Sequence, residues 1–169
     1  MAYDGRAVAN LLLDLADELG LSLTHMALHK VAFFAHGWRL AESGGPLIRQ
    51  QFEAWDYGPV LRPVYDAFKS AGRTKITARA HGFDPVERTP FLVTADFSSG
   101  DQGFLRAVLA AYGRYSAPQL SDMTHRAGSA WDRVWNAPDG KITLGMRIPN
   151  QHIREDFLAG RMDPPNGRG

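Results

Sequence analysis

Two histidines one helical turn apart, His25 and His29, are the first candidates for chemistry in this sequence. Imidazoles at this spacing can hold one metal ion between them, as a small metal-dependent hydrolase would require. A third ligand would have to come from elsewhere, because His36 lies about 10 Å further along the helix axis at the standard rise. Two residues at the edge of a helical core are the simpler interpretation. We therefore expect no metal site and no cofactor.

His125 is the candidate general base under the same hydrolase hypothesis. Asp122, three residues earlier, could orient it on one helix face. However, the sequence assembles no nucleophile around His125, and it lacks Gly-x-Gly-x-x-Gly, the Walker A loop, Gly-x-Ser-x-Gly and His-Glu-x-x-His. We favour a structural histidine that packs on Trp131, and we expect neither enzymatic activity nor a small-molecule substrate.

A DNA-binding transcriptional regulator is a further alternative, because Ala16, Gly20 and Met26 have helix-turn-helix spacing. The second helix should then offer Arg, Lys, Asn or Gln to base edges. The candidate positions instead hold Ser22, Leu23, Thr24, Ala27 and Leu28. The chain has 19 Lys and Arg against 18 Asp and Glu, and a net charge of +1 creates no broad attraction to nucleic acid. Nucleic acid is therefore not the partner we expect.

The densest unusual segment is Phe52-Glu53-Ala54-Trp55-Asp56-Tyr57-Gly58-Pro59-Val60. Aromatic side chains on a loop are effective anchors for a partner protein. The structural interpretation is a corner in which Phe52 and Trp55 fill the core and Glu53 pairs with a buried cation such as Lys30. Gly58-Pro59 would fix the turn. Both interpretations can hold together.

The elements that must position these residues are mainly helices. Asp4 and Gly20 bound a first helix, and Thr24 caps a second that runs to about Glu42. Apolar spacing and caps predict further helices opening at Pro59, Ser99, Ser116, Ser129 and Pro149. Residues 73–97 predict a loose hairpin or an extended excursion, and the stretch from Ile142 to Ile148 an extended segment. The expected fold is mainly α: a compact single-domain helical bundle over 1–160 with a small β-hairpin or short strands inserted, followed by a disordered tail over 161–169.

The composition limits both the chemistry that the protein can carry out and the cellular compartment that we expect for it. The chain has no cysteine, which excludes disulfides, a cysteine nucleophile and thiolate-held clusters. Its longest apolar runs, such as Val31 to Ala35, are too short to cross a bilayer. Acidic residues interrupt the N-terminal apolar stretch, which argues against a signal peptide. We expect a cytoplasmic protein with no membrane partner.

Three blocks of sequence resemble a known family. The first block runs from Leu28 to Trp38, the second from Phe52 to Val60 followed by Val64-Tyr65, and the third from Leu120 to His125 with Trp131 six residues on. In this order and spacing they resemble the Panacea antitoxin domain, also called SocA-like or phage-associated GepA-like. His29 stands where that pattern commonly has Gln. The acidic residue often found between the His and the Trp is missing here.

The resemblance implies a mostly helical domain with a small β element. It implies the antitoxin of a type II-like toxin–antitoxin system, which neutralises a cognate toxin protein encoded beside it by direct protein–protein binding. One described family member is also a proteolytic adaptor, so a AAA+ protease is a further expected partner. The residues that we expect to bind the partner or to carry the structural signature are Lys30, Glu53, Trp55, Tyr57, Gly58, Pro59, Tyr65, His125 and Trp131.

Overall fold

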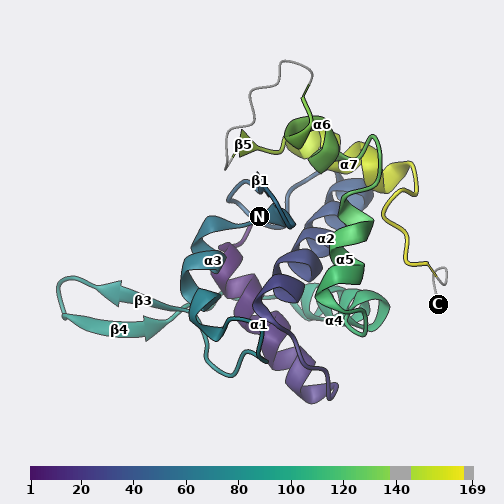
Figure 1. Ribbon diagram of the computed structural model, residues 1–169. Helices are drawn as coiled ribbons and strands as arrows, with labels where there is room; N and C mark the ends of the chain where they lie inside the picture. The colour runs from purple at the N-terminus through teal and green to yellow at the C-terminus, as the bar shows by residue number, and fades with distance from the viewer. Residues whose placement is uncertain (138–145, 166–169) are drawn as a thin grey trace.

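Helix α2 (His25–Ser43) is the central element of the structure, a computed structural model that describes residues 1–137 and 146–165 (Figure 1). Thr24 Oγ1 accepts a hydrogen bond from the Ala27 amide, and Gly44 ends the helix in a left-handed conformation. The side chains from Val31 to Ala35 are buried on every side of the helix. This is possible because α2 contacts helices on several sides: α1 (Gly5–Glu18), α4 (Ser99–Tyr112), α5 (Ala117–Thr124) and α7 (Asn150–Leu158).

The helix ends follow local capping signals. Asp4, Thr24, Ser116 and Ser129 cap α1, α2, α5 and α6 (Ala130–Trp135), and Ser116 with Gln119 forms the predicted capping box. The cap of α4 is Ser98, one residue before the predicted start. These observations confirm a mainly α fold.

The helix predicted to open at Pro59 begins instead at Arg62, as α3 (Arg62–Phe68), and a short 3-10 turn, η1 (Lys69–Ala71), follows it. Gly58 and Pro59 belong to a strand, β2 (Gly58–Val60), which pairs with β1 (Glu53–Trp55). The prediction was wrong because Pro63, rather than Pro59, occupies the first turn, where a missing amide costs no hydrogen bond.

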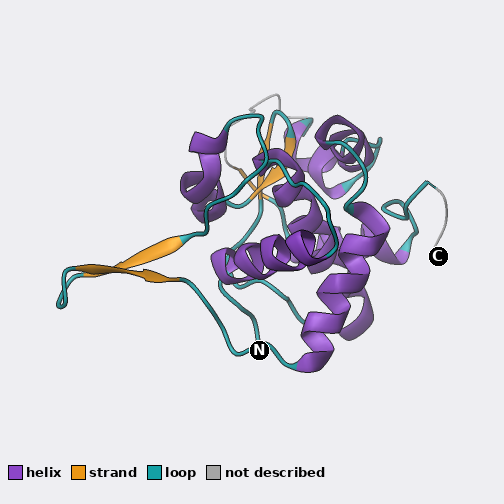
Figure 2. Ribbon diagram, turned by 90° about the horizontal axis from the view of Figure 1, so that it is seen from below, coloured by secondary structure: helices purple, strands orange, loops and turns teal. Residues whose placement is uncertain are grey.

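The strands form two small antiparallel sheets. The first has the order β2-β1-β5, where β5 (Met146–Arg147) lies within the segment predicted to be extended; residues 142–145 of that segment lie outside the described residues. The second is a hairpin of β3 (His81–Asp84) and β4 (Thr89–Leu92), which confirms the hairpin predicted over 73–97. This hairpin projects away from the helices (Figures 1 and 2).

The C-terminal segment differs in part from the predicted disordered tail. Met162 is buried in the hydrophobic core, and its carbonyl accepts a hydrogen bond from Tyr112 Oη at 2.8 Å. An apolar side chain within the polar segment supplies this anchor. Residues 166–169 lie outside the described residues. None of the helices over 1–137 and 146–165 has the length and apolar character that crossing a bilayer demands.

Candidate functional site

Residues from the three sequence blocks meet where β1 and β2 lie against α3, α5 and α6. Trp131 Nε1 donates to the Trp55 carbonyl at 2.7 Å, and the rings of Trp131 and His125 stack with centroids 3.9 Å apart. The rings of Trp55 and Tyr65 lie 4.7 Å apart. We call Trp55, Tyr57, Tyr65, His125 and Trp131 the aromatic corner. The predicted packing of His125 on Trp131 is confirmed.

Phe52 fills the core as predicted, but Trp55 is only partly buried. Glu53 does not pair with Lys30, so these two parts of the structural interpretation were wrong. Its carboxylate lies 3.3 Å from the Arg62 guanidinium and accepts a hydrogen bond from Trp55 Nε1 at 2.8 Å. Successive residues of a strand point to opposite faces. Buried Ala54 therefore faces the core, while Glu53 and Trp55 share the outer face. Arg62 also lies over the Trp55 ring, 5.1 Å from its centroid, as a cation–π contact.

Lys30 is fully buried beneath the corner, and among residues 1–137 and 146–165 it has no counter-ion. Its Nζ lies 3.9 Å from the Met26 Sδ, and no carboxylate of the described residues forms an ion pair with it. Desolvation by burial lowers the pKa of the Lys30 amine to about 7. The amine thus loses its proton near neutral pH, which is the least costly state for a buried, unpaired lysine.

Gly58 is required at its position for two reasons. Its φ of 108° lies in the region that side chains other than glycine avoid. A Cβ there would also lie 2.7 Å from Thr124 Oγ1 and 2.8 Å from Lys30 Cε. The strand can therefore lie directly on α2 and α5 only if this residue is glycine, and Pro59 continues it as a buried strand residue.

The two histidines of the hypothetical metal pair lie next to Lys30. The rings of His25 and His29 are 5.1 Å apart, and His29 Nδ1 accepts a hydrogen bond from the Leu61 amide at 3.3 Å. Burial, and then the Lys30 charge, lowers the pKa of each ring. Among residues 1–137 and 146–165, no group of three His, Asp or Glu side chains is placed to hold a metal ion. The described residues therefore give the hydrolase hypothesis no metal centre on which to rest.

His125 is also affected by the charge of Lys30. Burial first, and then the Lys30 charge, lowers the pKa of its ring, against the opposite effect of Asp122. Its Nε2 is buried and has no hydrogen-bond partner within the part of the chain that the structure describes. Because Trp131 covers its face, the ring acts as a packing element of the corner.

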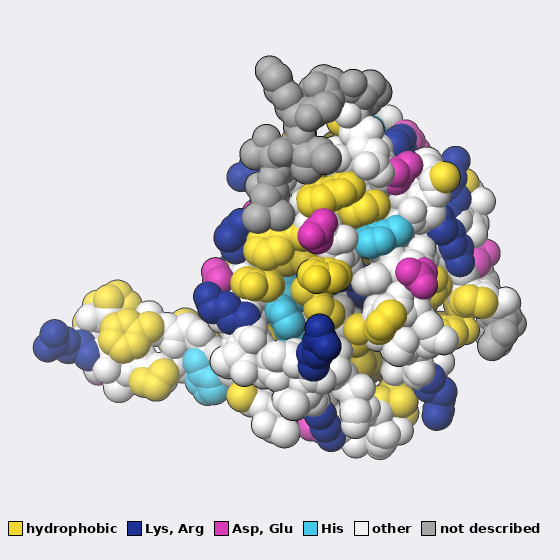
Figure 3. Space-filling view, viewed as in Figure 1, with side chains coloured by type: hydrophobic (Ala, Val, Ile, Leu, Met, Phe, Trp, Pro, Cys, Tyr) yellow, Lys and Arg dark blue, Asp and Glu magenta, His cyan; other side chains and the backbone are white. Residues whose placement is uncertain are grey.

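The corner has a rigid base and an accessible rim. Tyr57 is 67% exposed, whereas Trp131 is only 6% exposed. Ser121 Oγ donates to the Tyr57 carbonyl at 2.8 Å and holds the turn on α5. Figure 3 shows hydrophobic and histidine side chains gathered on this face of the molecule, with acidic and basic side chains among them. Such a surface suits contact with a protein more than it suits a reaction.

Two neighbours of the corner were not singled out from the sequence. Trp135 stacks on Trp131 with ring centroids 5.6 Å apart, and Arg62 covers Trp55. The spacing of four residues between the tryptophans on one helix is a signal that could have found Trp135. Arg62 carried no such signal, because its place depends on where α3 begins.

The helix-turn-helix hypothesis requires a recognition helix with exposed side chains, and the structure does not support one. That helix would be α2, whose residues Leu23, Ala27 and Leu28 at and near its start are buried. Their side chains pack within the core, so they cannot reach base edges in a groove.

Comparisons with known proteins match the part of the chain that contains the three sequence blocks. Residues 28–132 match the family model described as "Antitoxin SocA-like, Panacea domain", and this segment contains the whole aromatic corner and Lys30. The chain is 38% identical over 156 residues to Antitoxin SocA of Caulobacter vibrioides (strain NA1000 / CB15N), which covers 92% of this chain and 83% of that protein. No solved structure shows significant similarity.

Proposed function

The chain belongs to the SocA-like Panacea antitoxin family, and from this membership we propose that it is the antitoxin of a type II-like toxin–antitoxin system and neutralises its cognate toxin by direct binding in the cytoplasm. The observation that carries the proposal is the 38% identity to an antitoxin over 92% of the chain. Neutralisation by binding needs affinity and fit and no catalysis. A standard interface of roughly 1,600 Å² is within reach of a domain of this size.

The rim of the aromatic corner is our proposed contact surface for the toxin. Trp, Tyr and Arg dominate the binding energy of protein interfaces. The rim offers all three residue types: Arg62 lies over the Trp55 ring, and Tyr57 is exposed on the turn that follows β1. The hydrogen bonds to the Trp55 and Tyr57 carbonyls hold the turn before binding, so little conformational entropy is lost when a partner contacts it.

Co-expression with the product of the adjacent reading frame tests the proposal. That product should stop growth when expressed alone, and the wild-type chain should restore growth and co-purify with it. Tyr57→Ala should weaken the complex about tenfold or more at an unchanged melting temperature. Leu158→Ala is the matched control, because Leu158 is 59% exposed and lies on α7. A toxic neighbour that the wild-type chain neither binds nor neutralises would overturn the proposal.

An adaptor role is a separate part of the proposal: the bound toxin would be delivered to a AAA+ protease. The family resemblance supports it. The half-life of the toxin after translation is stopped should be shorter with the antitoxin present, and this difference should vanish in cells lacking the protease. A half-life that is the same with and without the antitoxin removes the adaptor role and leaves neutralisation by binding intact.

A further inference from the structure

The hairpin over residues 81–92, which we call the arm, exposes an unusual amount of apolar surface. Phe83, Val86, Phe91 and Leu92 are 62%, 84%, 50% and 48% exposed. The arm extends from the body of the molecule, with the chain on either side of it joining the helical body (Figures 1 and 2). Large apolar side chains grouped on a projecting element are typical of an interaction site.

The two faces of the arm are both apolar. His81 pairs with Leu92 and Phe83 with Pro90, so Phe83, Pro90 and Leu92 share one face. Phe91 lies on the other face opposite Gly82, where a Cβ would be 2.3 Å from the Phe91 ring. A partner that covers both faces must surround the arm, so it must offer a cleft. Pro90 also removes one backbone donor from β4, which hinders the addition of a further strand there.

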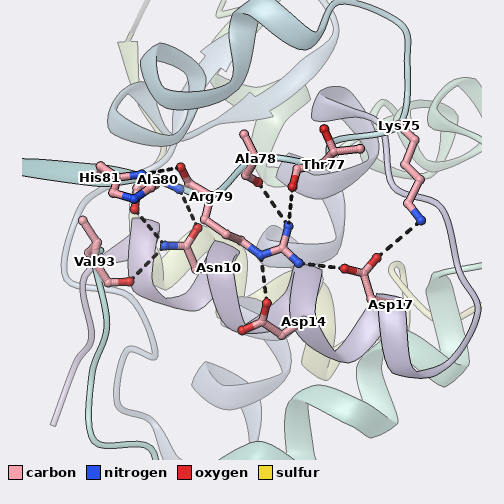
Figure 4. A network of polar contacts seen from close by, with 10 residues as sticks. All are labelled: Asn10, Asp14, Asp17, Lys75, Thr77, Ala78, Arg79, Ala80, His81 and Val93. Atoms are coloured by element: carbon pink, nitrogen blue, oxygen red, sulfur yellow. Dashed lines mark hydrogen bonds and ion pairs between the residues drawn. The ribbon is translucent and has the colours of Figure 1, made fainter. Parts of the chain in front are cut away.

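The base of the arm is fixed to α1 by a buried asparagine (Figure 4). Asn10 Nδ2 donates to the carbonyls of Ala80 and Val93 at 3.0 and 2.9 Å, and Asn10 Oδ1 accepts from the Ala80 amide at 2.7 Å. Ala80 and Val93 are the residues that flank the two strands, and the Val93 amide donates to the Ala80 carbonyl. One side chain therefore holds both strands of the arm at the point where they leave the body.

Charged residues add a second attachment beside Asn10. The Arg79 guanidinium lies 2.8 Å from Asp14 and 2.8 Å from Asp17, and Lys75 lies 3.4 Å from Asp17. Figure 4 shows Arg79 lying along α1 toward both carboxylates. The arm therefore holds its direction before any partner binds, and a preorganised element loses less conformational entropy on association.

We propose that the arm inserts into an apolar cleft of the toxin while the aromatic corner contacts the same molecule. This inference rests on the proposed function and adds a second, separate contact to it. Figure 3 shows the hydrophobic side chains of the arm and of the corner from the same side, so one partner can reach both.

The apolar groove on the far side of the chain is a poor receptor for the arm of a second copy. The chain has an apolar groove of about 190 Å³, lined by Trp38, Phe104, Val108 and Pro164 among others. The C-terminal segment that carries Pro164 lies on the side opposite the arm (Figures 1 and 2). Contacts from arm to groove would run head to tail and would not close within a pair of copies.

A shortened arm provides the direct test. The Val93 amide donates to the Ala80 carbonyl, so an Asn-Gly turn can replace residues 81–92 and join these two residues. The probe is the product of the adjacent reading frame, co-expressed and then titrated as purified protein. The shortened variant should bind it at least 100-fold more weakly than the wild type, and the double variant Phe83→Ser with Phe91→Ser at least tenfold more weakly. Leu158→Ser is the matched control and should bind as the wild type does.

The outcomes separate this inference from the proposed function. Wild-type affinity in both arm variants overturns the arm and leaves the proposed function standing, whereas no binding by the wild type defeats the proposed function itself. A wild-type dimer that the arm variants lose, with toxin affinity unchanged, makes a second copy the occupant and also overturns the inference. If the shortened chain fails to fold, the double serine variant decides, because its substitutions lie at exposed positions.

Discussion

Replacing Lys30 by methionine should stabilise the protein. Lys30 is fully buried, its polar contact is a thioether at 3.9 Å, and burial lowers the pKa of its amine from 10.5 to about 7. Methionine has a similar length and keeps the packing of the aliphatic stem. The substitution removes the amine and with it the cost of desolvation.

The magnitude follows from proton linkage. Between pH 7 and pH 10.5 the unfolded chain binds more protons than the folded chain, so the free energy of unfolding rises with pH in this window. At about 1.4 kcal/mol for each pKa unit, the lysine costs about 4 kcal/mol at pH 7.5 and about 2 kcal/mol at pH 9. The stabilising effect of Lys30→Met should therefore shrink by about 2 kcal/mol between these two values.

Urea unfolding of wild type and Lys30→Met at pH 7.5, 8.25 and 9 measures this difference. The range avoids the titration of His25, His29 and His125, whose pKa values burial lowers from 6.5. The wild-type curve should approach the curve of the variant as the pH rises. Two curves that stay parallel would refute the argument that the buried amine titrates near neutrality.

Further substitutions test the other structural arguments. In the same urea unfolding assay, Gly58→Ala should lower the free energy of unfolding by on the order of 3 kcal/mol, because it adds both backbone strain and a close contact. Gly20→Ala is the control: with a φ of 69° and open space around the residue, it should cost only about 1 kcal/mol. Asn10→Ala should cost about 3 kcal/mol and speed amide hydrogen exchange at Ala80 and Val93, and unchanged exchange would contradict its role as the anchor of the arm. Glu53→Ala should change stability by about 1 kcal/mol or less, because its partner Arg62 is half exposed; a loss of several kcal/mol would indicate that Glu53 compensates a buried charge.

Local sequence patterns were enough to predict most helices. Asp4 and Thr24 begin α1 and α2, and the capping box of Ser116 begins α5, because each signal acts through residues only a few positions away. The three blocks also pointed to the family, because their order and spacing can be read along the chain alone. Where two competing signals stood close together, as with Pro59 and Pro63, the local pattern was insufficient and the predicted start of α3 was wrong.

The sequence by itself determined the helical class and the central buried helix. It also identified the residues that form the aromatic corner. Only the tertiary structure decided that Glu53 turns outward to Arg62, that Lys30 is buried with no counter-ion among the residues the structure describes, and that Asn10 holds the arm. Helix caps and apolar periodicity depend on residues close together in the chain. Asn10, in contrast, contacts residues 70 and 83 positions away, and such contacts depend on how whole elements pack and on which strand face each side chain occupies.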